Sequence, residues 1–232
     1  MSKVYPTEHK YSHHLLMSKE KVVEEEEEDE VVRRCPSTLT VWKRSSMSFQ
    51  GTDGFTVFDR HGRLVFRVDN YSRNKAARLL LMDGAGNGLL SLKPQMLSMQ
   101  YQWNAYREEG EEGSYGKRSR VFSMMRRSPV FFHNGKDEAE VYMGSGRSKK
   151  AQSNTPDFTI EGSFRRRSCK IKNANGEVTA KIARKRVNST ILLSDDVFSL
   201  IVQPGFPTHL VMAFVIVLDR ICSKPFAPVF CS

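Results

Sequence analysis

The sequence lacks the short motifs that mark common catalytic and cofactor-binding sites. It contains no HExxH metal motif, no GxSxG nucleophile motif, no Walker A loop, and no cysteine placed in a motif with a histidine partner. The glycine-rich segment GAGNG at 84–88 lacks the last glycine of a dinucleotide fingerprint, and an expected strand follows it, so it predicts a turn. These absences favour a binding protein over an enzyme, with no cofactor.

Cysteine is scarce and scattered. The four residues, Cys35, Cys169, Cys222 and Cys231, form no CxxC pair, and the N-terminal segment lacks the basic and apolar regions of a secretory signal. We therefore expect a reduced, intracellular protein, cytoplasmic with peripheral plasma-membrane association, or nuclear. We expect Cys222 to be packed, and lipidation of Cys222 or Cys231 is the alternative.

No long apolar run suggests a membrane-spanning helix. Residues 210–218 form an unbroken apolar stretch of nine, whereas a spanning helix needs about 20 residues. This stretch lies in THLVMAFVIVLDRIC (208–222), which we predict to be a helix because Pro207 and Thr208 suit its start and Arg220 its last turn. A buried strand is the alternative, since Val and Ile are frequent there. A helix that is apolar on every face needs an apolar enclosure, and in a β-rich chain that enclosure is the inside of a barrel.

The N-terminal segment has little apolar periodicity. It contains His9, His13 and His14 and the acidic run EEEEEDE at 24–30, a composition typical of a solvated tail. The histidine spacing is compatible with weak metal binding, but without nearby cysteines or a rigid frame we expect no metal site. We predict a disordered acidic tail (1–34), one β-barrel domain (35–224) and a C-terminal tail (225–232).

One turn pattern occurs three times along the chain. In TVFDRHGRLVFRV (56–68), LLMDGAGNGLLSL (80–92) and KIKNANGEVTAKI (170–182), a strand-like segment reaches Asp or Asn, and Gly follows three positions after it. Asp or Asn can accept a backbone hydrogen bond at the first position of a turn, and Gly at the fourth allows positive φ. These segments predict hairpin tips, with a fourth at 133–135. Repeated hairpins without intervening helices favour an antiparallel sandwich or barrel.

Other candidate functional residues have simpler interpretations. Asp59 and Asp83 could resemble a pair of catalytic carboxylates, but the repeated turn pattern marks them as turn formers. Asp195 and Asp196 also fit a strand-entry turn. Trp42 and Trp103 lie in strand-like segments, and we expect both to pack in the core or on a sheet rather than stack on a ligand.

The order of these segments resembles the plant LURP-one-related family. The resemblance runs from LTVWKRS (39–45) through FQGTDGFTVFDRHGRLVFRVDNY (49–71) to FSLIVQPGFPTHLVMAFVIVLDRI (198–221), and covers about residues 36–222. The sequence departs from the family at Pro207, where Asp commonly follows QPGF.

The resemblance implies a Tubby C-terminal-like fold, a closed antiparallel barrel of about twelve strands around one hydrophobic helix near the C-terminus. That superfamily joins tubby-like proteins, which hold phosphoinositide headgroups and can act as membrane-tethered transcription regulators, to phospholipid scramblases. Some family relatives are linked to pathogen response in plants. The resemblance therefore implies a non-enzymatic module for phosphoinositides or anionic membranes, with a role in plant defence.

Positive charge is concentrated in the expected domain. The net charge is +10, and setting aside the seven negative charges of 24–30 leaves +17 on the rest of the chain. In the third hairpin, alternation places three lysines on one exposed face and Ile171, Val178, Ala180 and Ile182 on the other. We take as candidate anion-binding residues Lys170, Lys172 and Lys181 together with Arg165, Arg166, Arg167, Arg184, Lys185 and Arg186.

Two partner classes suit this charge. A phosphate-rich headgroup or anionic membrane gains charge-assisted hydrogen bonds from such a cluster. Nucleic acid ranks second because no helix-turn-helix, zinc-finger or RNP signature accompanies the charge. A nucleic-acid-binding or protein-interaction scaffold in transcriptional regulation is therefore the alternative function, and a solubilising outer face is the alternative explanation of the charge.

Overall fold

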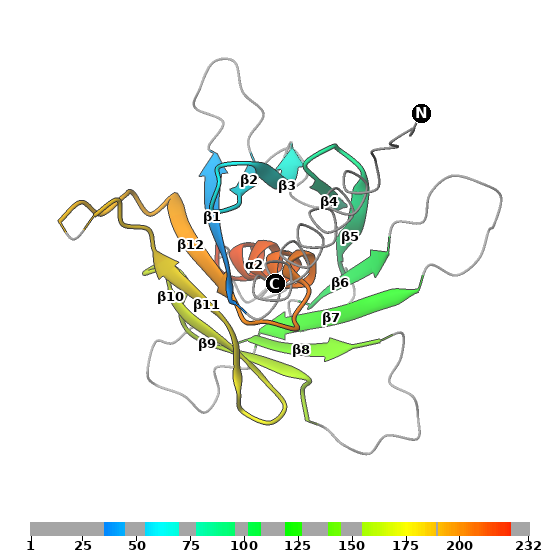
Figure 1. Cartoon of the computed structure of the whole chain (residues 1–232). Coiled ribbons are helices and arrows are strands. Elements are labelled where there is room, and N and C mark those ends of the chain that lie inside the picture. Colours follow the sequence, from blue (N-terminus) through cyan, green and yellow to red (C-terminus); the bar gives the residue numbers. More distant parts are fainter. Residues whose placement is uncertain are drawn as a thin grey trace, which may run out of the picture. The chain divides into compact units, whose positions relative to one another are not determined.

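Twelve antiparallel strands form a closed barrel around one helix (Figure 1). The structure is a computed structural model, and it describes residues 35–44, 54–69, 78–95, 102–107, 119–126, 139–144, 155–188 and 190–223. The chain divides into two units, Met1–Pro36 and Ser37–Ser232, and the barrel belongs to the second. The expected tails 1–34 and 225–232, the acidic run and the tip at 133–135 lie outside the described residues.

Every strand pairs with its neighbours in the sequence, and the first pairs with the last. The strands are β1 (Ser37–Arg44), β2 (Gly54–Phe58), β3 (Leu64–Asp69), β4 (Leu79–Asp83), β5 (Gly88–Pro94), β6 (Gln102–Arg107), β7 (Arg120–Arg126), β8 (Ala139–Met143), β9 (Phe158–Ser163), β10 (Ser168–Asn173), β11 (Val178–Arg184) and β12 (Val197–Val202). Pairing of Leu39 with Leu200 and of Val41 with Val57 places β1 between β12 and β2 and closes the ring. Closure removes the unpaired edges of an open sheet. The predicted fold class is confirmed.

The three predicted hairpin tips are present with the expected hydrogen bonds. The amide of Gly62 donates to the carbonyl of Asp59, and the corresponding Gly–Asp and Gly–Asn bonds close the other two tips. The three glycines have φ between +77° and +99°, a region that costs other residues strain. The first residue of each tip also accepts backbone hydrogen bonds through its side-chain oxygen. A one-residue register shift beside each tip completes a bulged hairpin.

The apolar segment near the C-terminus forms α2 (Thr208–Ser223), so the helix prediction is confirmed. The carbonyl of Pro207 accepts the first helical hydrogen bonds, from the amides of Leu210 and Val211, so the helix begins where predicted despite the missing Asp. Every residue from 211 to 221 is buried. In the middle of the helix, Phe214 meets Phe122 of β7 edge to face, with 4.8 Å between the ring centroids. Inward side chains of the strands complete this core.

Strand alternation assigns each connection to one end of the barrel. Antiparallel neighbours run in opposite directions, so the β9–β10 turn, the β11–β12 connection and the end of β1 share one end, which we call the upper end. The three hairpin tips lie at the other end, as does the connection from β12 into α2. The helix therefore runs through the barrel, and its C-terminal turn lies at the upper end. Within the described residues, no helix has the length and apolar character needed to cross a bilayer.

Candidate anion-binding surface

Lys170 and Lys181 lie directly opposite each other on adjacent strands. Lys170 of β10 pairs with Lys181 of β11, and the neighbouring inward residues Ile171 and Ile182 are buried. Both lysines are exposed on the outer face, as predicted. Among the residues that the structure describes, neither lysine forms an ion pair. Like charges directly opposite each other destabilise a sheet. On its other side Lys170 lies opposite Glu161 of β9, which offsets part of this repulsion.

Lys172 shares this face but has a partner. Its Nζ lies 2.7 Å from Oε2 of Glu161 on β9, and the lysine side chain is partly exposed. A register shift in β11 makes Thr179 buried and places Val178 opposite Lys172. The prediction that Val178 joins the inner apolar row was therefore wrong, because the bulge changes the alternation.

The three consecutive arginines after β9 separate into two groups. Arg165 and Arg166 are exposed in the turn, whereas Arg167 is buried with a φ of 50°. The guanidinium carbon of Arg167 lies 4.4 Å from the ring centroid of Phe164 and 4.3 Å from that of Phe198. The structure thus brings Arg165 and Arg166 to the upper end's surface, while Arg167 points into the barrel.

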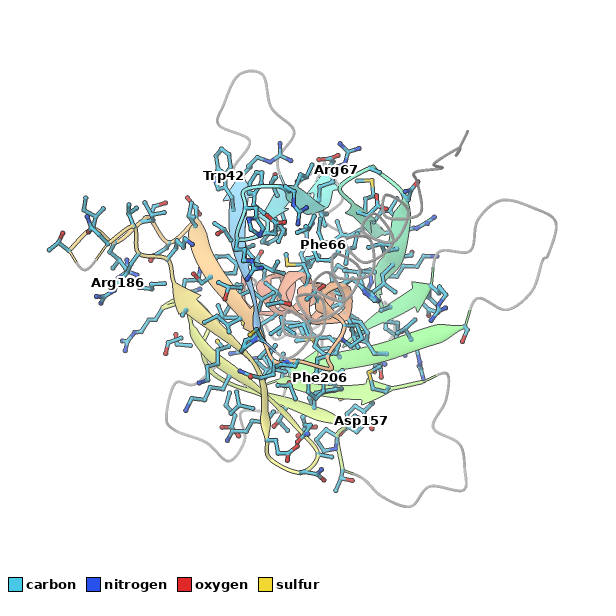
Figure 2. The ribbon with its side chains drawn as sticks, viewed as in Figure 1. Trp42, Phe66, Arg67, Asp157, Arg186 and Phe206 are labelled. Atoms are coloured by element: carbon cyan, nitrogen blue, oxygen red, sulfur yellow. The ribbon has the colours of Figure 1, made fainter. Side chains whose placement is uncertain are left out.

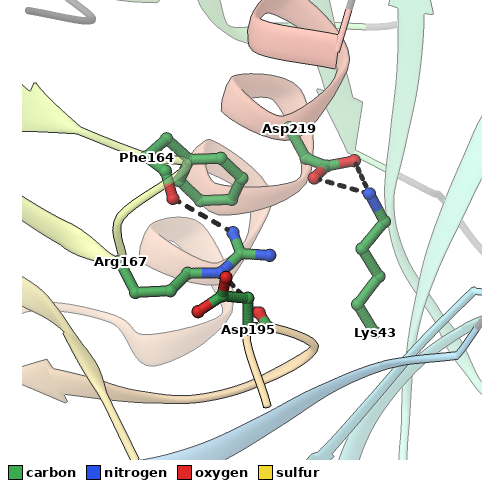
Figure 3. A network of polar contacts seen from close by, with 5 residues as sticks. All are labelled: Lys43, Phe164, Arg167, Asp195 and Asp219. Atoms are coloured by element: carbon green, nitrogen blue, oxygen red, sulfur yellow. Dashed lines mark hydrogen bonds and ion pairs between the residues drawn. The ribbon is translucent and has the colours of Figure 1, made fainter.

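Polar partners hold Arg167 in this position (Figure 3). Its Nε donates to the carbonyl of Asp195 at 2.7 Å and its Nη1 donates to the carbonyl of Phe164 at 3.4 Å. Burial lowers the pKa of Arg167, and the negative charges of Asp219, Asp195 and Asp196 oppose that change. The side chain therefore joins the β9–β10 turn to the start of β12 and is not presented to a ligand in solvent.

The remaining predicted residues lie at the base of the β11–β12 connection. Arg184 forms an ion pair with Asp195 at 3.0 Å, and both side chains are largely exposed. Lys185 is half-buried, and its carbonyl accepts from the amide of Leu193. Arg186 is exposed and forms a β-bridge with Leu192 (Figure 2). Arg165, Arg166 and Arg186 are exposed at the upper end, and Arg184 there pairs with Asp195.

Lys43 and Asp219 form an ion pair that the sequence analysis missed. Nζ of Lys43 lies 2.8 Å and 2.9 Å from the two carboxylate oxygens of Asp219, whose side chain is almost completely buried. The pair joins β1 to the C-terminal turn of α2. The sequence contains a signal for this ion pair. Lys43 follows Leu39 and Val41 with a period of two and therefore faces inward, and a cation that faces inward requires an acidic partner.

The two tryptophans lie in different environments. Trp103 is 2% exposed in the core, as expected. Trp42 is 46% exposed on the outer face of β1, so it lies on the sheet and not in the core. Alternation along β1 explains the difference, because Val41 and Lys43 occupy the inward positions on either side of it.

The carboxylates singled out from the sequence act in turns. Hydrogen bonds from Asn87 lower the pKa of Asp83, so this group stays ionised as a turn acceptor. The turn before β12 is also present, since the amide of Val197 donates to the carbonyl of Ser194. In the described ranges, no three His, Cys, Asp or Glu side chains are grouped as metal ligands would be. Cys222 packs partly against the core, and Cys231 lies outside the described residues.

Comparison with known proteins gives a consistent result over most of the chain. The family model described as LURP-one-related matches residues 37–219. Protein LURP-one-related 17 of Arabidopsis thaliana is 34% identical over 191 residues, covering 81% of this chain and 84% of that protein. Protein LURP-one-related 8 of the same plant is 37% identical over 185 residues, covering 78% and 85%.

A solved structure supports the fold. The X-ray structure of a protein from Arabidopsis thaliana superposes with a TM-score of 0.54 at 19% identity, covering 82% of this chain and 95% of that one. At this identity the likeness concerns the fold alone. The family model and the relatives show that the chain belongs to the LURP-one-related family.

Proposed function

We propose that this protein is a non-enzymatic binding module for anionic membrane surfaces, with phosphoinositide or other anionic phospholipid headgroups as its ligand. The observation that carries the proposal is the exposed pair of Lys170 and Lys181, two lysines at opposite positions on adjacent strands with no ion-pair partner among the described residues. A phosphate between them would replace a repulsion with two charge-assisted hydrogen bonds.

The surrounding residues suit a multivalent anionic surface better than one small anion. Arg165 and Arg166 lie in the turn that begins β10, and Arg186 lies on the connection that follows β11. The basic residues therefore extend from the wall of the barrel to its upper end. Each Lys or Arg near an anionic bilayer contributes about 1 kcal/mol, so several such contacts can hold a protein at the membrane.

Two other considerations agree with this role. The family resemblance implies a superfamily that includes phosphoinositide-binding tubby-like proteins and phospholipid scramblases. The carboxylates of the described tips are used as turn acceptors, which favours binding over catalysis. A role in plant defence and a peripheral plasma-membrane location follow from the same resemblance as parts of the proposal.

Substitution of the opposed lysines tests the proposal. Lys170→Gln with Lys181→Gln should weaken binding to vesicles of phosphatidylcholine with anionic phosphoinositide about thirtyfold, because two contacts of about 1 kcal/mol are lost. Co-sedimentation at physiological salt measures this. The control is Arg60→Gln with Lys93→Gln, which removes two positive charges from a hairpin tip and from β5, outside the proposed surface.

The same experiment separates the competing partners. The control variant should bind vesicles like the wild type, and both variants should keep nearly the wild-type melting temperature because none of the four changed side chains is buried. Unchanged vesicle binding by the Lys170/Lys181 variant would exclude this surface. Tighter binding to duplex DNA than to vesicles at matched salt would favour nucleic acid instead.

A further inference from the structure

The described residues on the two sides of the β11–β12 connection, 185–188 and 190–193, pair with each other as a hairpin. The amide of Leu193 donates to the carbonyl of Lys185 at 2.9 Å, and the amide of Val187 donates to the carbonyl of Ile191 at 3.0 Å. In Figure 1 this segment projects beyond the ring of strands, at the left of the view. We call residues 185–193 the upper hairpin.

Asn188 pairs several polar groups of the upper hairpin. Oδ1 of Asn188 accepts from the amides of Thr190 and Ile191, at 3.0 Å and 2.7 Å, and from the hydroxyl of Thr190 at 2.9 Å. The Val187–Ile191 backbone bond lies beside this turn. A backbone whose polar groups are paired internally can enter an apolar medium at much lower cost than an open loop.

The same tip exposes an unusual amount of aliphatic surface. Val187 is 64% exposed, Ile191 53% and Leu192 38%. Among the described residues, five large apolar side chains are this exposed, and three of the five belong to the upper hairpin. Such clustering of exposed apolar groups indicates contact with another apolar phase.

We propose that the upper hairpin is a membrane anchor, with Val187, Ile191 and Leu192 inserting among the lipid acyl chains at the bilayer surface. Exposed positive charge lies at its base, where anionic lipid headgroups would be attracted, and Arg184 there neutralises Asp195. This inference rests on the proposed function and adds how deeply the protein enters the membrane. The basic surface attracts the protein to the bilayer, and the upper hairpin inserts into it.

The size of the tip favours a bilayer over a protein partner. A stable protein interface needs about 800 Å² from each partner, which is much more than a few residues at a hairpin end can supply. A bilayer needs no matching surface, and a few aliphatic side chains add to the electrostatic attraction. The apolar side chains flank a turn in which Asn188 accepts several hydrogen bonds, and the basic residues lie nearer the barrel.

Vesicle binding with a matched control tests the insertion. Val187→Gln with Ile191→Gln should weaken binding to phosphatidylcholine–phosphatidylserine vesicles at least tenfold, by a factor that is similar at low and high salt because the lost contacts are apolar. Leu192→Gln alone should weaken it severalfold. The control Leu64→Gln alters a leucine of equal exposure, 37%, on β3 and should have no effect.

The depth of the tip is measured separately. In a Trp42→Phe background, where Trp103 is buried, Ile191→Trp places a fluorophore on the upper hairpin. We expect lipids brominated in their acyl chains to quench its emission when the protein is bound to vesicles. Absence of quenching in vesicle-bound protein would overturn the insertion.

Failure of the inference and failure of the proposed function differ in outcome. If the wild type binds anionic vesicles and the Val187/Ile191 variant binds equally well, the inference is wrong and the basic surface is sufficient. If that variant instead changes only the oligomeric state measured by light scattering, the tip contacts protein and the inference is also wrong. If the wild type binds no vesicles, the proposed function fails first and the inference with it.

Discussion

At the scale of single residues, conformation decides what three adjacent arginines do. Arg165 and Arg166 keep ordinary exposed positions, whereas a φ of 50° at Arg167 directs its side chain between Phe164 and Phe198. The sequence has three consecutive arginines here, and no neighbouring residue predicts that the third is buried while the first two are exposed. The difference arises from Phe198 and the Asp195 carbonyl, which are about thirty residues away in the chain and could not be placed without the fold.

Asp59 is a residue whose ionisation supports a turn. Desolvation raises its pKa, but hydrogen bonds from the backbone and side chain of Arg63 and from the backbone of His61 outweigh it and lower the pKa to about 2. Because the folded pKa lies below the ordinary value of 3.8, its contribution to stability is fully present above pH 3.8 and is lost as the pH falls through about 2.

We predict that Asp59→Asn keeps the fold at pH 7, since Asn173 makes the same backbone bonds at the third tip. Its urea midpoint should fall less than that of the wild type between pH 5 and pH 2.5, because asparagine does not titrate. Asp59→Ala, which removes the acceptor, should be less stable at both pH values. A wild-type-like acid dependence in Asp59→Asn would assign the acid sensitivity to other carboxylates.

At the scale of elements, short sequence patterns predicted the hairpin tips and the helix. They did not predict which face of each strand points into the barrel. The Asp/Asn-to-Gly pattern works within four residues, so the tips were readable from the sequence, and the length and hydrophobicity of 208–222 identified α2. The exposure of Trp42 depended on which side of β1 faces the barrel. The position of Val178 depended on a bulge. Both are set by register, which the alternation of one strand does not fix.

The enclosure of α2 makes the barrel sensitive to charge at its centre. Val215 is completely buried. We predict that Val215→Asp prevents folding, because an unpaired buried carboxylate costs several kcal/mol against a total stability of about 5–15 kcal/mol. Val215→Ala should fold and lose about 1–3 kcal/mol from transfer and cavity terms. Circular dichroism and urea unfolding distinguish the two, and a folded Val215→Asp protein would mean that water reaches the helix.

At the scale of the whole molecule, the up-and-down topology gathers basic residues from distant segments. Antiparallel order places the β9–β10 turn and the upper hairpin at the same end, and pairing of β10 with β11 brings Lys170 opposite Lys181. The sequence predicted the shared face of these lysines from alternation. It could not predict that Glu161 would pair with Lys172, while the other two form no ion pair with any described residue. The strongest part of the proposed surface therefore depends on cross-strand register.

The charge balance of the whole chain leads to a last prediction, on regulation of membrane binding. The run 24–30 carries seven negative charges and is joined to a remainder of +17. Tethering raises the effective concentration of a weak competitor to about the millimolar range, so this run should compete with lipid phosphates for the basic residues.

Removing residues 1–34 should therefore tighten binding to anionic vesicles at low salt. It should change little at high salt, because screening beyond a Debye length of a few ångströms weakens both interactions. Replacing only the acids of 24–30 with their amides should have the same effect, which separates charge from the loss of chain. Equal vesicle affinity of the full-length and shortened proteins at low salt would exclude this competition, since the remainder of +17 would then attract the membrane with or without the acidic run.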